Sequence, residues 1–176
     1  MTMTTPSLEP TQIVLDRDVP LVRITREFNA PVEKVFRAHT DPDLFAQWNG
    51  PRALVTDVDE HDCRTGGSYR YTMTGDGFEG GFRGCFHDVR PNELIVQTFT
   101  YEGMPDGVAL EKIRFVDLGE GRTRLVATSL VDSFDDRDAF IASGMETGVR
   151  EGYARLDDLL ARESGGSDHG PRGRSR

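Results

Sequence analysis

The residues that most often do chemistry in enzymes are few and scattered in this chain. His39, His61 and His87 lie far apart, and no two of them have the spacing of a helical metal site. His87 is the strongest candidate for proton transfer, because a strand through it would place it on one face with Arg83 and Cys85, in a segment expected to line the interior. A catalytic role for His87 therefore stays open beside a purely structural one, and no catalytic motif is predicted.

The two cysteines and the acidic run do not indicate a metal site. Cys63 and Cys85 have no CxxC pair and no nearby histidine at ligand spacing, so we expect reduced structural thiols. The acidic residues are Asp57, Asp59, Glu60 and Asp62. They lack the glycine and the terminal glutamate of a calcium loop and are typical of a solvated strand edge. No cofactor is expected.

Nucleophilic catalysis and phosphate binding are equally unsupported. The chain has no Gly-x-Ser-x-Gly elbow that would activate a serine. The glycine pairs of 75–77 and 119–121 predict hairpin turns, since neither precedes a helix as a phosphate-binding loop would. The formal net charge of -9 also disfavours a nucleic-acid partner.

A set of large apolar side chains is the better candidate for a site. Tyr69, Tyr71 and Met73 alternate along one segment and would share a strand face. The expected ligand-binding residues are Trp48, Tyr69, Tyr71, Met73, Phe82, Phe86, Phe99, Phe115, Met145, Val149 and Tyr153. Ordinary core filling is the alternative, but buried tyrosine hydroxyls need partners and could orient a ligand.

The elements that would position these residues follow from periodicity. Strands are predicted for 21–28, 53–61, 68–74, 78–89, 94–101, 110–117 and 123–131, with a short apolar piece at 13–15 before them. Two short helices are predicted after the first long strand, one opened by Pro31 and one capped by Asp41. A strand, two helices, a meander and a final helix predict an α+β fold with an antiparallel sheet and its helices on one side.

The final helix is predicted to run from about Asp135 to Arg162, with Ser133 and Asp136 as a capping box. Its apolar stripe consists of Ile141, Met145, Val149, Tyr153, Leu156 and Leu160. Gly144, Gly148 and Gly152 recur every four residues, although glycine lowers helix stability. We favour a close approach of the sheet backbone to that side of the helix as the reason, with space for a ligand or a homodimer interface as alternatives.

The 176 residues predict one domain, at 11–163, with disordered ends at 1–10 and 164–176. No stretch is long and apolar enough to cross a bilayer, and the first residues lack the pattern of a secretion signal. We therefore expect a soluble, cytoplasmic protein.

Several strings, taken together and in order, resemble the START-like (SRPBCC) superfamily, in the branch named after the activator of the heat-shock-protein ATPase. They are Arg26-Glu-Phe-Asn-Ala-Pro31, Thr40-Asp-Pro-Asp-Leu-Phe-Ala-Gln-Trp48, Gly50-Pro51, Asp62-Cys-Arg-Thr-Gly-Gly67 and Gly144-Met-Glu-Thr-Gly148. The resemblance covers nearly all of 22–161. At Asn49 and Val149 the chain differs from many relatives.

The resemblance implies a helix-grip fold, in which a curved sheet wraps around the last helix and leaves a cavity for an apolar ligand. It implies a binding protein for a small hydrophobic or aromatic molecule as the leading function. Two alternatives remain: an enzyme like the polyketide cyclases and aromatases, with His87, Arg83 or Tyr71 moving a proton, and an interaction module like the co-chaperone.

Overall fold

The computed structural model describes residues 10–165. Residues 1–9 and 166–176, most of the two segments expected to be disordered, lie outside this range, so that expectation stays a prediction. Of the helices within the range, none is long and apolar enough to span a membrane.

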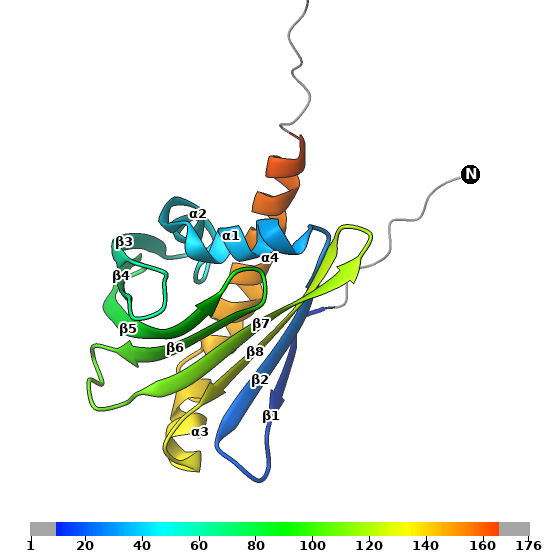
Figure 1. Cartoon of the computed structure of the whole chain (residues 1–176). Coiled ribbons are helices and arrows are strands. Elements are labelled where there is room, and N and C mark those ends of the chain that lie inside the picture. Colours follow the sequence, from blue (N-terminus) through cyan, green and yellow to red (C-terminus); the bar gives the residue numbers. More distant parts are fainter. Residues whose placement is uncertain (1–9, 166–176) are drawn as a thin grey trace, which may run out of the picture.

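The described chain forms one antiparallel sheet with helices on its concave side (Figure 1). Its strands, in sheet order, are β1 (Gln12–Leu15), β2 (Leu21–Phe28), β8 (Arg122–Leu130), β7 (Ala109–Gly119), β6 (Leu94–Tyr101), β5 (Phe78–Arg90), β4 (Ser68–Gly75) and β3 (Val55–His61). Its helices are α1 (Val32–Thr40), α2 (Pro42–Trp48), α3 (Phe134–Ala142) and α4 (Met145–Gly165). The predicted α+β, helix-grip fold is confirmed.

The sheet is a meander from β3 to β8 to which an N-terminal hairpin is added. β1 pairs with β2, and β2 pairs along its whole length with β8. The period-two residues Val22, Ile24 and Phe28 are buried on the concave face. Asp76 and Glu120 have positive φ angles in the expected hairpin turns, where two glycines flank each of them.

The helices α1 and α2 close one end of the curled sheet. The Asp41 carboxylate accepts hydrogen bonds from the backbone N–H groups of Asp43 and Leu44, which confirms the predicted cap of α2. The indole Nε1 of Trp48 donates to the carbonyl oxygen of Ala38 at 2.8 Å. This bond ties the end of α2 to α1 and fixes the indole against the interior.

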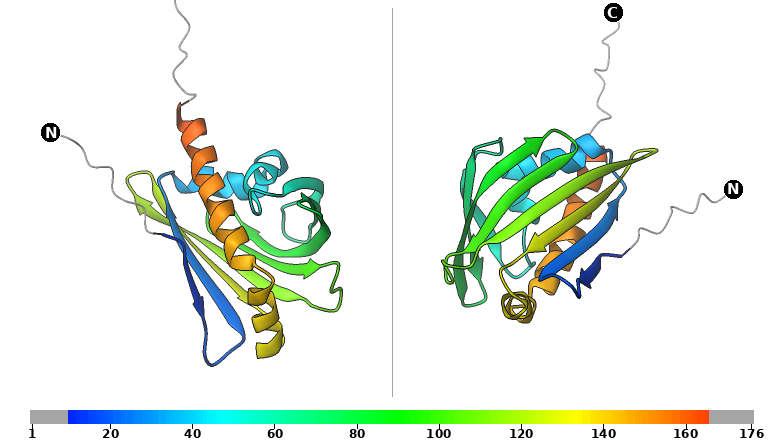
Figure 2. Two further views of the ribbon diagram at one scale, coloured as in Figure 1. Left: turned by 180° about the vertical axis from the view of Figure 1, so that it is seen from behind. Right: turned by 60° about the horizontal axis from the view of Figure 1, so that its bottom comes forward.

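The expected single final helix is divided into α3 and α4, and the prediction of one continuous helix is wrong at this point. Ser133 caps α3 by accepting from the backbone N–H of Asp136, as predicted, but the helix stops at Ala142. Gly144 has a φ angle of 88°, which side chains disfavour and which ends the helical path. The chain then turns into α4, which lies across the concave face (Figure 2).

Gly152 is where α4 comes closest to the α2 end of the fold. A Cβ atom at this position would lie 3.3 Å from the carbonyl oxygen of Trp48 and 3.4 Å from the backbone nitrogen of Gly50. Gly152 therefore does allow close backbone packing, but against the end of α2 and Gly50, so the expected packing against the sheet is wrong at this position. The apolar residues that follow on α4, Tyr153 and Leu156, are buried beside it.

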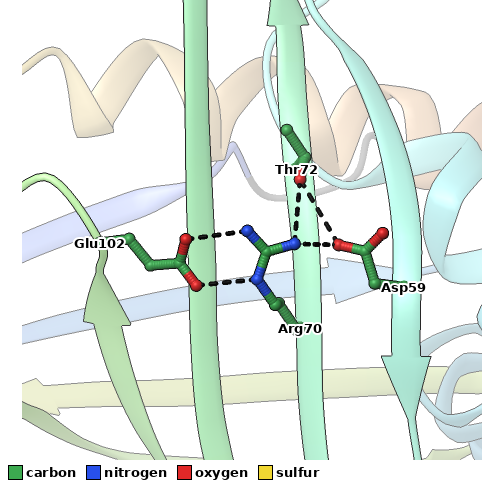
Figure 3. A network of polar contacts seen from close by, with 4 residues as sticks. All are labelled: Asp59, Arg70, Thr72 and Glu102. Atoms are coloured by element: carbon green, nitrogen blue, oxygen red, sulfur yellow. Dashed lines mark hydrogen bonds and ion pairs between the residues drawn. The ribbon is translucent and has the colours of Figure 1, made fainter.

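A polar network holds the curl of the sheet from its outer side (Figure 3). Arg70 on β4 forms a two-pronged ion pair with Glu102, with N–O distances of 2.8 and 2.9 Å, and a second ion pair with Asp59 on β3. Gly81 on β5 lies between the partners, and a Cβ atom there would lie 2.2 Å from a Glu102 oxygen. The missing side chain of Gly81 thus lets the ion pair bridge β5.

Candidate functional site

A cavity of about 440 Å³ lies between the concave face of the sheet and α4. Ten of the eleven expected site residues line it: Trp48, Tyr69, Tyr71, Met73, Phe82, Phe86, Phe99, Met145, Val149 and Tyr153. They come from α2, β4, β5, β6 and α4. Period-two alternation in the strands and the four-residue step in the helix bring them to one interior, as the sequence predicted.

Phe115 is the exception among the expected site residues. It is buried, but its ring packs against Phe36 and His39 of α1, with centroid distances of 5.2 and 5.1 Å. It shares the inner face of β7 with Ile113, which does line the cavity. Phe115 lies further along that face, where α1 covers it, so it belongs to the core beside the cavity.

The aromatic walls are organised as stacked and edge-on pairs. Phe82 stacks on Tyr71 at 5.2 Å and on Phe99 at 5.7 Å between ring centroids. Phe45 meets Tyr71 edge-on at 5.4 Å. These rings offer flat apolar faces to the interior, which suits a ring-bearing or otherwise hydrophobic molecule.

The strand through His87 lines the cavity as expected, but His87 itself does not face it, so the proton-transfer role left open for His87 finds no support. Phe82 and Phe86 take the inner face of β5, and alternation therefore sends Arg83, Cys85 and His87 to the outer face, where all three are exposed. None of these three borders the cavity. Tyr71, the third residue considered for proton transfer, is buried and does line it, and burial raises the pKa of its hydroxyl.

A row of polar residues crosses the inner face, and sequence reasoning missed it. Gln97 on β6 pairs in register with Glu111 on β7, which in turn pairs with Ser129 on β8. All three line the cavity. The alternation of inner and outer residues along the strands could have shown this row. Gln97 lies between Ile95 and Phe99 on the inner face of β6, and Glu111 lies two residues before Ile113 on the inner face of β7.

Glu111 is the acidic group of this row. Its Oε2 accepts a 2.8 Å hydrogen bond from the Nε2 of Gln97, which also lies 3.4 Å from the hydroxyl of Tyr69. Burial raises the pKa of Glu111 to about 7, and the bond from Gln97 offsets only part of that rise. The carboxyl group can therefore take up or release a proton near neutral pH.

Two histidines border the cavity near α1 and stay uncharged at neutral pH. Burial lowers the pKa of His39 to about 4, while its Nδ1 bonds to the carbonyl oxygen of Val35 at 2.8 Å. Burial also lowers the pKa of His61. The Nε2 of His61 donates to the carbonyl oxygen of His39 at 3.1 Å, which makes its Nδ1 a hydrogen-bond acceptor.

Two buried polar atoms of the lining have no protein partner within the described residues. They are Nδ1 of His61 and Oγ of Ser129. A buried polar atom without a hydrogen bond costs about 1–3 kcal/mol, so native structures rarely keep one unless something else binds there. The two atoms are candidate partners for a guest molecule or water.

The cavity is bordered at one end by the junction of α3 and α4, through Phe140, Ser143 and Gly144. No residue of α3 is buried. Phe140 and Ile141 pack against the core while only partly buried. A helix without a buried residue is expected to open at a lower free-energy cost than α4, which buries five residues.

In residues 10–165, no group of three or more His, Cys, Asp or Glu side chains is placed to hold a metal ion. Cys63 and Cys85 are both free thiols. Asp57, Asp59 and Glu60 are exposed on β3, which is an edge strand, as the sequence predicted for the acidic run.

Solved structures and a protein family share this architecture. A search of curated proteins found no match. Among solved structures, a protein from Chromobacterium violaceum is 28% identical with a TM-score of 0.69, covering 80% of this chain and 96% of the other. A protein from Arthrobacter aurescens is 25% identical with a TM-score of 0.79, covering 93% of this chain and 98% of the other.

A protein from Mycobacterium smegmatis has the same fold, with a TM-score of 0.79 at 24% identity, over 92% of this chain and 100% of the other. The sequence profile of the family described as "Activator of Hsp90 ATPase homolog 1-like protein" matches residues 29–161, about three quarters of the chain. The match runs from the start of α1 into α4 and so includes the whole cavity wall formed by β3 to β8. The chain therefore belongs to the activator of Hsp90 ATPase homolog 1-like family of the START-like superfamily.

Proposed function

We propose that this protein binds a small hydrophobic or aromatic molecule in the cavity between the sheet and α4. The observation that carries the proposal is the cavity itself, about 440 Å³ in volume, with aromatic walls and a few convergent polar groups. Ligand sites in proteins usually have volumes of about 300–1,000 Å³ and this kind of lining. The family relationship supports it, because the START-like fold is a ligand-binding fold.

The size of the cavity supports binding over core filling. Protein interiors are close-packed and leave few voids larger than one water molecule, which occupies about 30 Å³ in the liquid. Stacked rings such as Tyr71, Phe82 and Phe99 surround a larger space here. An apolar guest would restore the contacts that those rings lack on their open side.

A second candidate function, an enzyme that folds or rearranges an apolar substrate, is favoured by one group. Glu111 lies in the cavity with a pKa of about 7, which suits a general acid or base at neutral pH. The exposed Arg83 and His87 carry no part of this candidate. The loss of turnover in Glu111→Gln, with ligand binding kept, would separate enzyme from carrier.

The binding proposal is tested with the uncharged dye N-phenyl-1-naphthylamine, whose emission rises in apolar sites. We expect saturable binding of one dye per chain. Val149→Phe, which fills the cavity from α4, should weaken the binding by at least about tenfold, which is about 1.4 kcal/mol. Val116→Phe is the matched control, because Val116 is 40% exposed on β7 and does not line the cavity.

Both variants are first compared with the parent by thermal unfolding, so that a misfolded variant is recognised. Equal dye affinity in Val149→Phe and Val116→Phe, or no saturable binding by the parent chain, would overturn the proposal. In the second case, capture of a chaperone by the purified chain would point to the interaction module that the family name suggests.

A further inference from the structure

We propose that the ligand carries a protonated amine, and that Glu111 binds its ammonium group at the middle of the polar row formed with Gln97 and Ser129. This inference rests on the proposed function, since it names the chemical class of molecule that the cavity accepts. It assigns a ligand-contacting role to a polar residue of the cavity wall.

The geometry of the row leaves one side of Glu111 open. Gln97 supplies a donor to Oε2 of Glu111, and no protein group in the described chain donates to Oε1. Ser129, on the other side, has a buried hydroxyl without a partner. A donor group placed in the cavity beside Glu111 would complete the hydrogen bonds of the carboxylate and the serine together.

The charge balance of the cavity selects the sign of the ligand. The lining contains the carboxyl group of Glu111 and no lysine or arginine within the described residues. Arg26, on the inner face of β2, is already paired with Asp157 on α4. A buried anion without a counterion is costly, so a cationic ligand is favoured and a carboxylate ligand of the same shape is disfavoured.

Aromatic rings next to the row support a cation further. Burial raises the pKa of Tyr69 and of Tyr153, and for both the next cause is the nearby charge of Glu111. Both tyrosines line the cavity. An ammonium group beside Glu111 would therefore lie near ring faces, which attract cations by about 0.5–2 kcal/mol.

The pH dependence depends on the titratable and charged groups around Glu111. Tyr69 and Tyr71 from β4 and Tyr153 from α4 feel its charge. His39 from α1 and His61 from β3 line the same cavity, and the charge of Arg26 on β2 acts on Tyr153. Burial raises the pKa values of the tyrosines and lowers those of the two histidines, whereas it raises the pKa of Glu111 to about 7. Protonation of Glu111 removes the charge that an ammonium group needs.

The test is a competition in which the chain is first loaded with N-phenyl-1-naphthylamine. The three competitors are 4-phenylbutylamine and 4-phenylbutan-1-ol, which share one hydrocarbon part, and 4-phenylbutanoate, in which the carboxylate carbon replaces the last methylene group. At pH 8 the amine should displace the dye at concentrations lower than the butanoate by at least about tenfold. The ratio of the affinity for the amine to the affinity for the alcohol should fall between pH 8 and pH 6. Below the pKa of Glu111 it should fall by up to about tenfold per pH unit.

The Glu111→Gln variant keeps the shape of the side chain and its bond to Gln97 but removes the charge. It should lose the preference for the amine, while its affinity for the alcohol stays within about threefold. Glu79→Gln, on an exposed glutamate of β5, is the matched control and should behave like the parent chain.

The outcomes separate the two proposals. If the parent chain fails to bind the dye, the proposed function itself is overturned. If the dye binds but the alcohol or the butanoate displaces it as well as the amine does, or if Glu111→Gln keeps the amine preference, the cavity remains a ligand site and the assignment of Glu111 is wrong.

Discussion

Gln97 on β6 donates from its Nε2 to the Oε2 of Glu111 on β7 at 2.8 Å, and both side chains border the cavity. This pair places a titratable carboxyl group in the middle of an aromatic-walled interior. Because burial disfavours the charged form of this half-buried group, and its second oxygen has no protein donor in the described chain, the carboxylate costs stability when it is charged. The residue proposed to select the ligand therefore also affects stability.

The first prediction concerns the pH dependence of stability. The pKa of Glu111 is raised in the folded state to about 7 from an ordinary value of 4.5, so its favourable contribution is fully present below pH 4.5 and is lost as the pH rises through 7. Glu111→Gln should therefore raise the free energy of unfolding at pH 8, by at most about 3 kcal/mol, and change it little at pH 5. Urea unfolding at the two pH values measures this difference. A Glu111→Gln effect that is the same at both pH values, or that matches Glu79→Gln, would contradict it.

The second prediction concerns the glycines of α4. Gly148→Ala should stabilise the helix by about 0.5–1 kcal/mol, because its Cβ atom would meet only the ring of Pro51, at an ordinary 3.6 Å. Gly152→Leu should destabilise the chain by about 1–3 kcal/mol, because it would press on the backbone of Trp48 and Gly50. Thermal unfolding of the two variants measures both changes in stability. Equal effects of the two substitutions would show that α4 is not closely packed at Gly152.

The third prediction concerns α3 as the movable wall of the cavity. None of its residues is buried, whereas α4 buries residues such as Leu156 and Leu160. We expect backbone amides in 134–142 to exchange with deuterium faster than those in 153–160, and the exchange in 134–142 to slow when the dye is bound. Hydrogen exchange followed by mass spectrometry measures both. Equal protection of the two segments without dye would exclude an easily opened wall.

The fourth prediction concerns the two free thiols. Cys85 is exposed on the outer face of β5, whereas burial, with a smaller contribution from Asp62, raises the pKa of Cys63 to about 12. At pH 8 a disulfide reagent such as 5,5′-dithiobis(2-nitrobenzoate) should modify Cys85 faster than Cys63, by at least about tenfold. Cys85→Ser should remove the fast phase. A fast phase that persists in Cys85→Ser would place Cys63 at the surface.

The fold could be predicted closely because its signals are local and repeated. Alternation fixed the faces of Tyr69, Tyr71 and Met73, and the Asp41 cap marked the start of α2. The break at Gly144 could not be predicted from periodicity, because the apolar residues keep their helical spacing on both sides of it, from Ile141 to Met145 and Val149. Periodicity reports which side of an element is apolar and does not report where the helix axis bends.

The lining of the cavity could be predicted only in its apolar part, and whether it binds a ligand stays a prediction. Alternation assigned Phe115 to the right face of its strand but could not show that α1 covers that end of it. It also placed Arg83 and His87 opposite to Phe82 and Phe86, which the search for a catalytic histidine overlooked. The polar row depends on the register of β6, β7 and β8, which comes from tertiary pairing and not from any one segment.

The most direct test of a ligand in the cavity uses Trp48, the single tryptophan of the chain, whose indole Nε1–H gives one signal in a nitrogen–proton NMR spectrum. The chain is titrated with 4-phenylbutylamine at pH 8. Occupation of the cavity predicts saturable shifts of the Trp48 indole, of the Gln97 side-chain amide and of the Gly148 and Gly152 backbone amides, all with one affinity. The absence of any shift, or shifts confined to outer-face positions such as Arg83, Cys85 and His87, would contradict the account.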